Sequence, residues 1–126
     1  MTESAPLLPP PEAGQATVEL ALVLPVIVML GLVLVQATLV LRDQLMVVHA
    51  AREAVRAASL DPDPTRARAA AEAVLPGAAV RLGRRPPVGE MVAVEVHYRS
   101  PTVVPLVGPL LADPALTARA VMQVER

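Results

Sequence analysis

The feature that most constrains this chain is an uncharged apolar run, Leu20–Leu41, which is 22 residues long. Only Gln36 and Thr38 are polar within it, and a charged residue closes it on either side. A helix of about 20 apolar residues crosses a hydrocarbon core of about 30 Å. A chain of 126 residues has no core large enough to bury such a helix on every side. The run therefore predicts a transmembrane helix over residues 15–41.

This run differs from a cleaved secretory signal and is expected to bend. The apolar region of such a signal is about 7–15 residues long and follows a basic segment. Here the run is longer, and residues 1–19 contain no basic side chain. Pro25 lies inside the run and lacks the N–H that a helix uses for hydrogen bonding. We therefore expect a retained anchor helix with a kink at Pro25.

The composition of the whole chain excludes several classes of function. Without Cys there is no disulfide, thiolate metal site or cysteine nucleophile. A net charge of −1 and a single aromatic residue, Tyr98, argue against nucleic-acid binding. His49 stands alone, and Glu95 with His97 would need further ligands to hold a metal. We predict no catalytic, cofactor-binding or metal-binding residue, and no cofactor.

Helical periodicity continues beyond the apolar run. The helix is expected to start near Ala16 or Thr17, with Thr17 as its cap. The segment Arg42–Leu60 contains neither Pro nor Gly, so the same helix is expected to reach Leu60. Its small apolar residues recur at helical spacing: Val47, Ala51, Ala54 and Ala58. The sequence Asp61-Pro62 stops the helix, because proline restricts the residue before it to extended conformations. A second, short helix is predicted over Thr65–Leu75.

The pattern then changes to the alternation that is typical of strands. A short strand is expected at Val80–Leu82, a clear one at Met91–Arg99 and a third at Leu116–Glu125. One face of each long strand is apolar: Val92, Val94, Val96 and Tyr98 in the first, and Leu116, Ala118, Ala120, Met122 and Val124 in the second. The fold class is therefore α+β: a long N-terminal helix packed on a small antiparallel sheet. Residues 42–126 form the extramembrane domain.

The segment Thr102–Ala112 is uncharged and apolar, although its prolines exclude regular structure. Three roles fit this composition: covering the sheet, touching the membrane surface, or binding a partner. Covering the sheet is the interpretation that we favour from the sequence.

The residues around Gly14 resemble a known processing region. Residues 1–14 form a Pro-rich leader, and the string GQATVE from Gly14 to Glu19 leads directly into the apolar run, as in type IV pilin-like proteins. The longer string GQATVELALVLP, Gly14–Pro25, resembles the TadE family of tight-adherence pilus assembly systems. Three later segments are similar to actinobacterial TadE-like proteins: Arg42-Asp43, His49–Ala58 and Leu116–Glu125.

This resemblance implies a site and a set of partners. A prepilin peptidase would cut after Gly14, so that Gln15 becomes the new N-terminus and Glu19 the fifth residue. The Glu19 carboxylate could then pair with the freed amine, within one chain or between neighbouring subunits. Alternatively, Glu19 only marks the membrane interface. The implied partners are the lipid bilayer, the peptidase, other pilin-like subunits and pilus assembly proteins.

Two functions remain open, and two arguments disagree about orientation. The chain is a minor pseudopilin-like component of a tight-adherence pilus or related secretion apparatus, or else an uncleaved single-pass membrane protein whose small domain binds another protein. Arg42, Arg52 and Arg56 follow the run while no basic residue precedes it, which favours a cytoplasmic C-terminus. The family resemblance implies a cytoplasmic N-terminus and an extracytoplasmic domain in the cell membrane.

Overall fold

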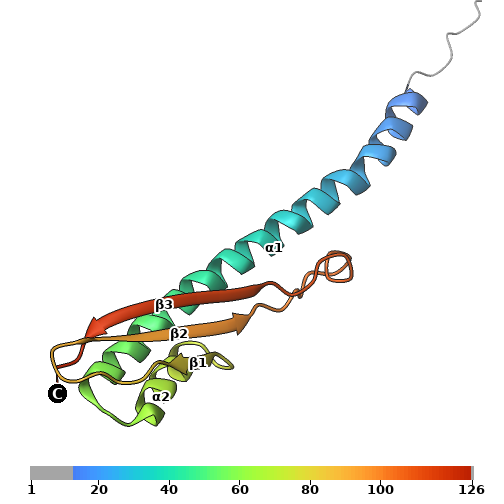
Figure 1. Cartoon of the computed structure of the whole chain (residues 1–126). Coiled ribbons are helices and arrows are strands. Elements are labelled where there is room, and N and C mark those ends of the chain that lie inside the picture. The colour runs from blue at the N-terminus through green and yellow to red at the C-terminus, as the bar shows by residue number, and fades with distance from the viewer. Residues whose placement is uncertain (1–12, 126) are drawn as a thin grey trace, which may run out of the picture.

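The computed structural model describes residues 13–125, in which one long helix carries a small α+β head at its C-terminal end (Figure 1). The elements are α1 (Ala13–Leu60), α2 (Pro64–Val74), β1 (Ala79–Leu82), β2 (Met91–Arg99) and β3 (Ala115–Gln123). We call α2, the sheet and the C-terminal half of α1 the head. This arrangement confirms the predicted α+β class. Most of the expected leader, residues 1–12, lies outside the described residues.

Helix α1 is longer than the sequence suggested. It begins at Ala13, so Thr17 lies inside the helix and the expectation that Thr17 caps its start was wrong. Between Ala13 and Thr17 there is no proline to limit the helix, and a long helix extends readily once it has formed. Its other end is as expected, because the N–H of Asp61 still bonds to the carbonyl of Ala57 at 3.0 Å before Pro62.

The C-terminal half of α1 provides the helical side of the core. The predicted apolar positions are all buried: Val47, Ala51, Ala54 and Ala58. Ala67 and Ala71 of α2 are fully buried in the same cluster. Because alanine side chains are short, α2 and the sheet can both pack close to α1. The buried core is therefore almost entirely alanine and valine, with Leu75 at its edge, in agreement with a chain that has Tyr98 as its single aromatic residue.

Helix α2 starts with a conventional N-cap. The carboxylate of Asp63 accepts a hydrogen bond from the backbone N–H of Thr65 at 2.9 Å, and Pro64 occupies the first turn. Hydrogen bonds from Thr65 lower the pKa of Asp63 below its usual value of 3.8. The bond from the Thr65 side chain has the larger effect, and the bond from its backbone N–H the smaller. The N–H groups in the first turn of a helix have no partner within the helix, and the Asp63 carboxylate provides one for Thr65.

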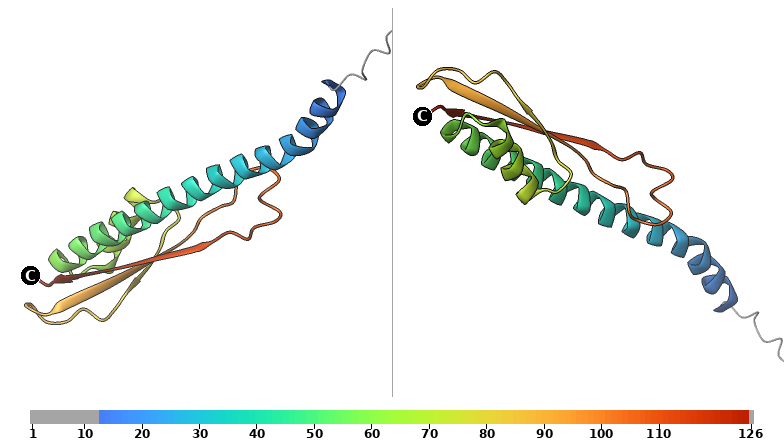
Figure 2. Two further views of the ribbon diagram at one scale, coloured as in Figure 1. Left: turned by 90° about the horizontal axis from the view of Figure 1, so that it is seen from above. Right: turned by 90° about the horizontal axis from the view of Figure 1, so that it is seen from below.

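The sheet is an antiparallel meander in the order β1-β2-β3. Val94 of β2 pairs with Leu82 of β1 and with Ala120 of β3. On β2 the residues Val92, Val94 and Val96 are buried, and on β3 the predicted apolar face is the more buried one, which confirms both assigned faces. The sheet lies against α1 on its inner side and faces solvent on the other (Figure 2).

The apolar segment Thr102–Ala112 does not cover the sheet, which differs from the interpretation favoured above. It continues past the ends of β2 and β3 and runs beside α1 towards the helix's N-terminal half (Figures 1 and 2). The inner face of the sheet is already covered by α1, and the outer face carries polar side chains such as Glu95 and Arg119. The sheet therefore offers this segment no free apolar surface.

Candidate assembly surface

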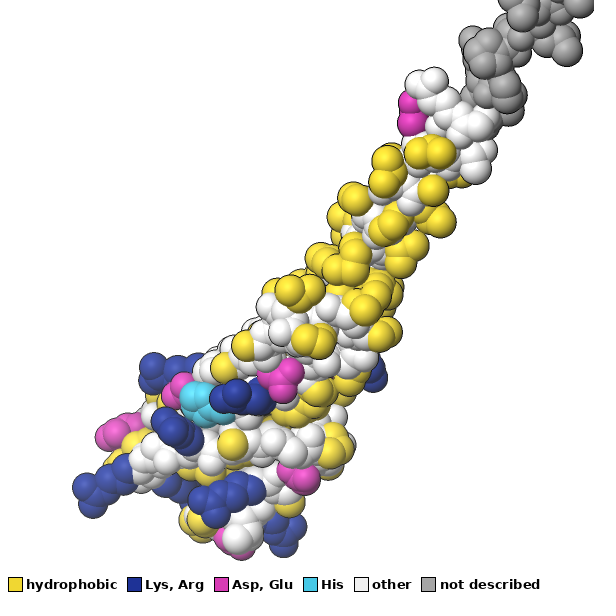
Figure 3. All heavy atoms as spheres, turned by 90° about the vertical axis from the view of Figure 1, so that its right-hand side faces the viewer, with side chains coloured by type: hydrophobic (Ala, Val, Ile, Leu, Met, Phe, Trp, Pro, Cys, Tyr) yellow, Lys and Arg dark blue, Asp and Glu magenta, His cyan; other side chains and the backbone are white. Residues whose placement is uncertain are grey.

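Most of the N-terminal half of α1 is an apolar surface that the described chain leaves uncovered. Its most apolar stretch of 18 residues is long enough to cross a membrane, and none of that stretch is buried. Leucines are exposed around the helix, including Leu22, Leu30 and Leu34. Figure 3 shows the hydrophobic side chains gathered along this part of α1, whereas the charged side chains gather on the head. Such a surface requires lipid or other helices around it.

The residues of the predicted processing site lie in the first two turns of α1. Gly14, Gln15 and Glu19 are all exposed. The side-chain amide of Gln15 donates a hydrogen bond to the Glu19 carboxylate at 3.4 Å, a long contact between residues one turn apart. The structure thus brings Gln15 and Glu19 together, and both side chains are exposed. Their roles in processing and assembly remain predictions.

Inside the apolar run, the polar and irregular residues are accommodated in different ways. The hydroxyl of Thr38 donates to the carbonyl of Leu34 at 2.9 Å, so it is satisfied within the helix. Gln36 is only 3% exposed, and neither polar atom of its amide has a hydrogen-bond partner among the described residues. Pro25 lies within α1, which curves towards its N-terminal end (Figure 2). The kink at Pro25 remains a prediction.

In the head, His97 lies beside two other polar side chains. Nε2 of His97 lies 3.1 Å from Oε1 of Glu95, and Nδ1 lies 3.1 Å from the hydroxyl of Thr117. Within residues 13–125 no group of three potential ligands gathers around a point. His49 is exposed on α1, away from this pair in sequence and on a different element. His97, Glu95 and Thr117 form part of the polar face of the sheet.

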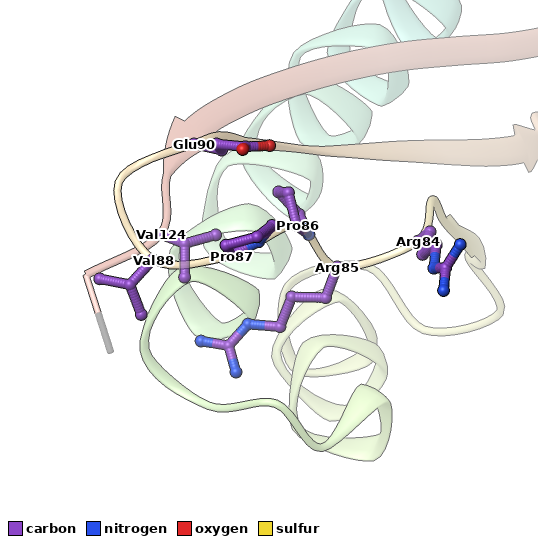
Figure 4. Close-up of a pocket in the computed structure, with 7 residues that line it drawn as sticks. All are labelled: Arg84, Arg85, Pro86, Pro87, Val88, Glu90 and Val124. Atoms are coloured by element: carbon purple, nitrogen blue, oxygen red, sulfur yellow. The ribbon is translucent and has the colours of Figure 1, made fainter.

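One open hollow of about 700 Å³ lies between the β1–β2 connection and the end of β3 (Figure 4). Its lining combines cationic, acidic and apolar groups: Arg84, Arg85, Pro86, Pro87, Val88, Glu90 and Val124. The Arg85 guanidinium donates to the carbonyl of Ser59 at 3.3 Å, which ties the connection to the end of α1.

The one helix among the described residues that is long and apolar enough to cross a membrane suggests a single-pass membrane protein. The family model described as TadE-like protein matches residues 14–56, which confirms the resemblance to the TadE-like family. The match begins at Gly14 and ends in the packed half of α1, so it contains Gln15, Glu19 and Pro25. TadE-like proteins are a pilus-related structural family rather than a family of enzymes. No curated protein and no solved structure was found to match the chain.

The sequence did not reveal two contacts of the head with α1. The hydroxyl of Ser100 donates to the carboxylate of Asp43 at 2.6 Å, and the carbonyl of Ser59 accepts from the N–H of Glu125 at 3.1 Å. Both join positions more than 50 residues apart. Neither serine belongs to a motif, so no local signal could have identified these contacts.

Proposed function

We propose that this protein is a membrane-anchored, minor pseudopilin-like component of a tight-adherence pilus or related secretion apparatus. The observation that carries the proposal is the bare apolar half of α1, which lies within the segment that matches the TadE-like family. The protein acts by helix-to-helix assembly in the plane of the membrane and performs no chemistry of its own. Its partners are lipid, other pilin-like subunits and pilus assembly proteins.

The shape of α1 supports assembly through this helix. The apolar residues surround the helix instead of forming one stripe, so a neighbouring helix can pack on more than one side. Gly31 has no side chain, so a neighbouring helix can approach α1 closely at this position. Nothing in the described chain lies within 4 Å of the point where a side chain would begin. Helix α2 and the sheet pack on the C-terminal half of α1 and leave most of this surface open.

Cleavage by a prepilin peptidase after Gly14 would complete the proposed assembly site. The cut creates an amine on Gln15, one helical turn from the Glu19 carboxylate. Burial among apolar helices strengthens the attraction between these opposite charges and makes an unpaired carboxylate costly. Glu19 therefore favours the assembled state when it pairs with an amine, in its own chain or in a neighbouring one.

The first experiment measures the intact mass and N-terminal sequence of the protein purified from membranes that contain a prepilin peptidase. We expect a mature chain that starts at Gln15. The Gly14→Val variant should keep its leader, whereas Gly31→Ala, the matched glycine substitution inside the run, should be processed normally. A wild-type chain that retains residues before Gly14 would contradict processing and favour an uncleaved anchor with a protein-binding head.

A second experiment separates assembly from processing. The Glu19→Gln variant should be cleaved as the wild type is, yet should lose cross-linking between neighbouring subunits through α1. Glu53→Gln, at an exposed position on the packed half of α1, is the matched control and should leave cross-linking unchanged. Equal cross-linking in both variants would show that Glu19 only marks the interface.

We also propose that the N-terminus is cytoplasmic and the head extracytoplasmic. This orientation follows from peptidase processing and opposes the distribution of arginines around the run. A protease added outside intact spheroplasts should digest the head, and a cytoplasmic control protein should survive. Protection of the head until the membrane is opened would reverse the assignment.

A further inference from the structure

The segment Thr102–Ala112, here called the apolar loop, displays large hydrophobic side chains that the rest of the chain does not cover. It contains no charged residue. Leu106 is 64% exposed and Leu110 is 72% exposed, and Val103 and Leu111 are also exposed. A solvent-facing loop of a water-soluble domain rarely gathers four such residues. The loop therefore requires an apolar partner.

The conformation of the loop holds these side chains outward. At its base the N–H of Thr102 donates to the Asp113 carboxylate at 2.8 Å. Inside it, the N–H of Gly108 donates to the carbonyl of Val104 at 3.0 Å, and the N–H of Leu111 to that of Val107 at 3.0 Å. The side chains of Val104 and Val107 are buried. The loop thus has a buried inner side and an exposed outer side.

The loop lies beside the apolar run of α1. Its start is fixed by the hydrogen bond from Ser100 to Asp43 at 2.6 Å. Gln36 is almost fully buried although Val35 and Ala37 beside it are exposed. Because the loop runs beside α1 beyond the end of the sheet (Figure 2), we infer that the loop covers Gln36. Seven residues separate Gln36 from Asp43, or roughly 10 Å along a helix. The loop therefore extends along the run for at least this distance.

Charged residues mark one common boundary on the two segments. Arg42 and Asp43 follow the apolar run, and Arg99 and Asp113 stand on either side of the loop and its base. The hydrogen bonds of Ser100 and Thr102 hold these four residues near one level of the molecule. On the N-terminal side of this level, neither the loop nor α1 carries a charge until Glu19. The change from polar to apolar surface thus occurs at the same level in both.

Distances along α1 place this level at the membrane interface if α1 spans the bilayer. From Glu19 to Gln36 the helix rises roughly 26 Å, and from Glu19 to Arg42 roughly 35 Å. The hydrocarbon core is about 30 Å thick, and about 40–45 Å with the headgroups. The loop lies between these two levels, where headgroups and the ends of the acyl region meet. The hydrogen bonds inside the loop lower the cost of placing its backbone there.

We propose that the apolar loop is a second membrane contact, with Leu106 and Leu110 inserted into the leaflet that α1 crosses next to the head. The loop and α1 both expose large apolar side chains on the N-terminal side of the charged level, and lipid around α1 meets both. Two points of attachment fix the tilt of the head on the membrane, which a single helix does not do. The inference depends on α1 spanning the bilayer but not on the pilus function.

Depth-dependent fluorescence tests this proposal, because the chain has no Trp and each substitution supplies a unique fluorophore. The full chain is reconstituted in phosphatidylcholine vesicles with bromine at a shallow or a deep acyl position. Leu106→Trp and Leu110→Trp are the test variants. Leu24→Trp, in the run, is the reference for insertion. Val88→Trp, at a position that is 64% exposed in the β1–β2 connection, is the reference for solvent.

The expected result is blue-shifted emission for both loop variants, with severalfold stronger quenching by shallow than by deep bromine. Leu24→Trp should be quenched by deep bromine, and Val88→Trp by neither lipid. Loop variants that behave like Val88→Trp while Leu24→Trp is quenched would overturn the proposal and leave the anchor intact. Blue-shifted emission without bromine quenching, increasing with the protein-to-lipid ratio, would overturn it and assign the surface to a second copy. An unquenched Leu24→Trp would overturn the anchor and this inference together.

Discussion

The two halves of α1 form one continuous helix but bury their apolar residues in different ways. In the C-terminal half, small residues on one side, such as Ala51 and Ala54, pack on α2 and the sheet, while His49 on the other side faces solvent. In the N-terminal half, leucine and valine surround the helix and remain exposed. The comparison shows that only the C-terminal half of α1 is packed against the rest of the chain. The other half depends on a partner outside the chain, which is lipid or a neighbouring helix.

The largest effect should come from charging the uncovered half. We expect Leu24→Arg combined with Leu30→Arg to cost about 5–7 kcal/mol of membrane insertion, because each Arg near the centre of a span costs about 2.5–3.5 kcal/mol. Alkaline carbonate extraction should release the variant from membranes. The matched pair Leu45→Arg with His49→Arg, at exposed positions of the packed half, should remain embedded. Equal extraction of both would mean that the two halves do not differ in this way.

The next effect should come from enlarging the same residue type in each half. Ala54→Leu places extra methyl groups in a fully buried position, and we expect it to lower the free energy of unfolding of the head by about 1–3 kcal/mol. Ala37→Leu, at an exposed position, should leave that free energy unchanged. Urea titration of the full chain in micelles, followed through the near-ultraviolet signal of Tyr98, measures both. A tolerated Ala54→Leu would show that the alanine contact is loose.

A smaller loss of stability should follow from replacing a glycine of the head whose φ angle is positive than from the core substitution above. Gly89, in the turn before β2, has φ of +93°, a conformation that residues with a side chain rarely adopt. Gly89→Ala should therefore lower the free energy of unfolding by about 1–2 kcal/mol in the same titration. Gly31→Ala, where α1 is helical and uncrowded, should leave the head unchanged. A Gly89→Ala head as stable as the wild type would show that the turn relaxes.

The smallest effect concerns the pH dependence of the head. The pKa of Asp63 is lowered in the folded chain by its hydrogen bonds from Thr65, so the ionised cap stabilises the head above the unfolded pKa. This contribution is lost as the pH falls through the folded pKa. Asp63→Asn, which keeps a capping group without the charge, should lower the melting temperature slightly at pH 7 and match the wild type below the folded pKa. The same difference at both pH values would contradict this assignment.

Sequence periodicity was sufficient for the elements that follow one strong pattern. The strand Met91–Arg99 has the predicted bounds, and the four positions of α1 that recur at helical spacing are buried. The helix also buries Ala50, Val55 and Ser59, which were not predicted. The start of α1 was wrong by several residues, because a helix end depends on local hydrogen bonding that no pattern encodes. The placement of the apolar loop could not be predicted, because its composition fits a sheet cover and a membrane contact equally well.

The sequence by itself determined the long apolar N-terminal helix and the small antiparallel sheet of an α+β fold, since these follow from the order and type of residues. It also carried the resemblance of Gly14–Pro25 to the TadE-like family. Only the tertiary structure decided that the apolar loop lies beside α1 (Figure 2) and that Gln36 is buried. The reason is physical: a hydrogen bond such as that from Ser100 to Asp43 joins residues 57 positions apart, and chain folding alone sets which distant segments meet.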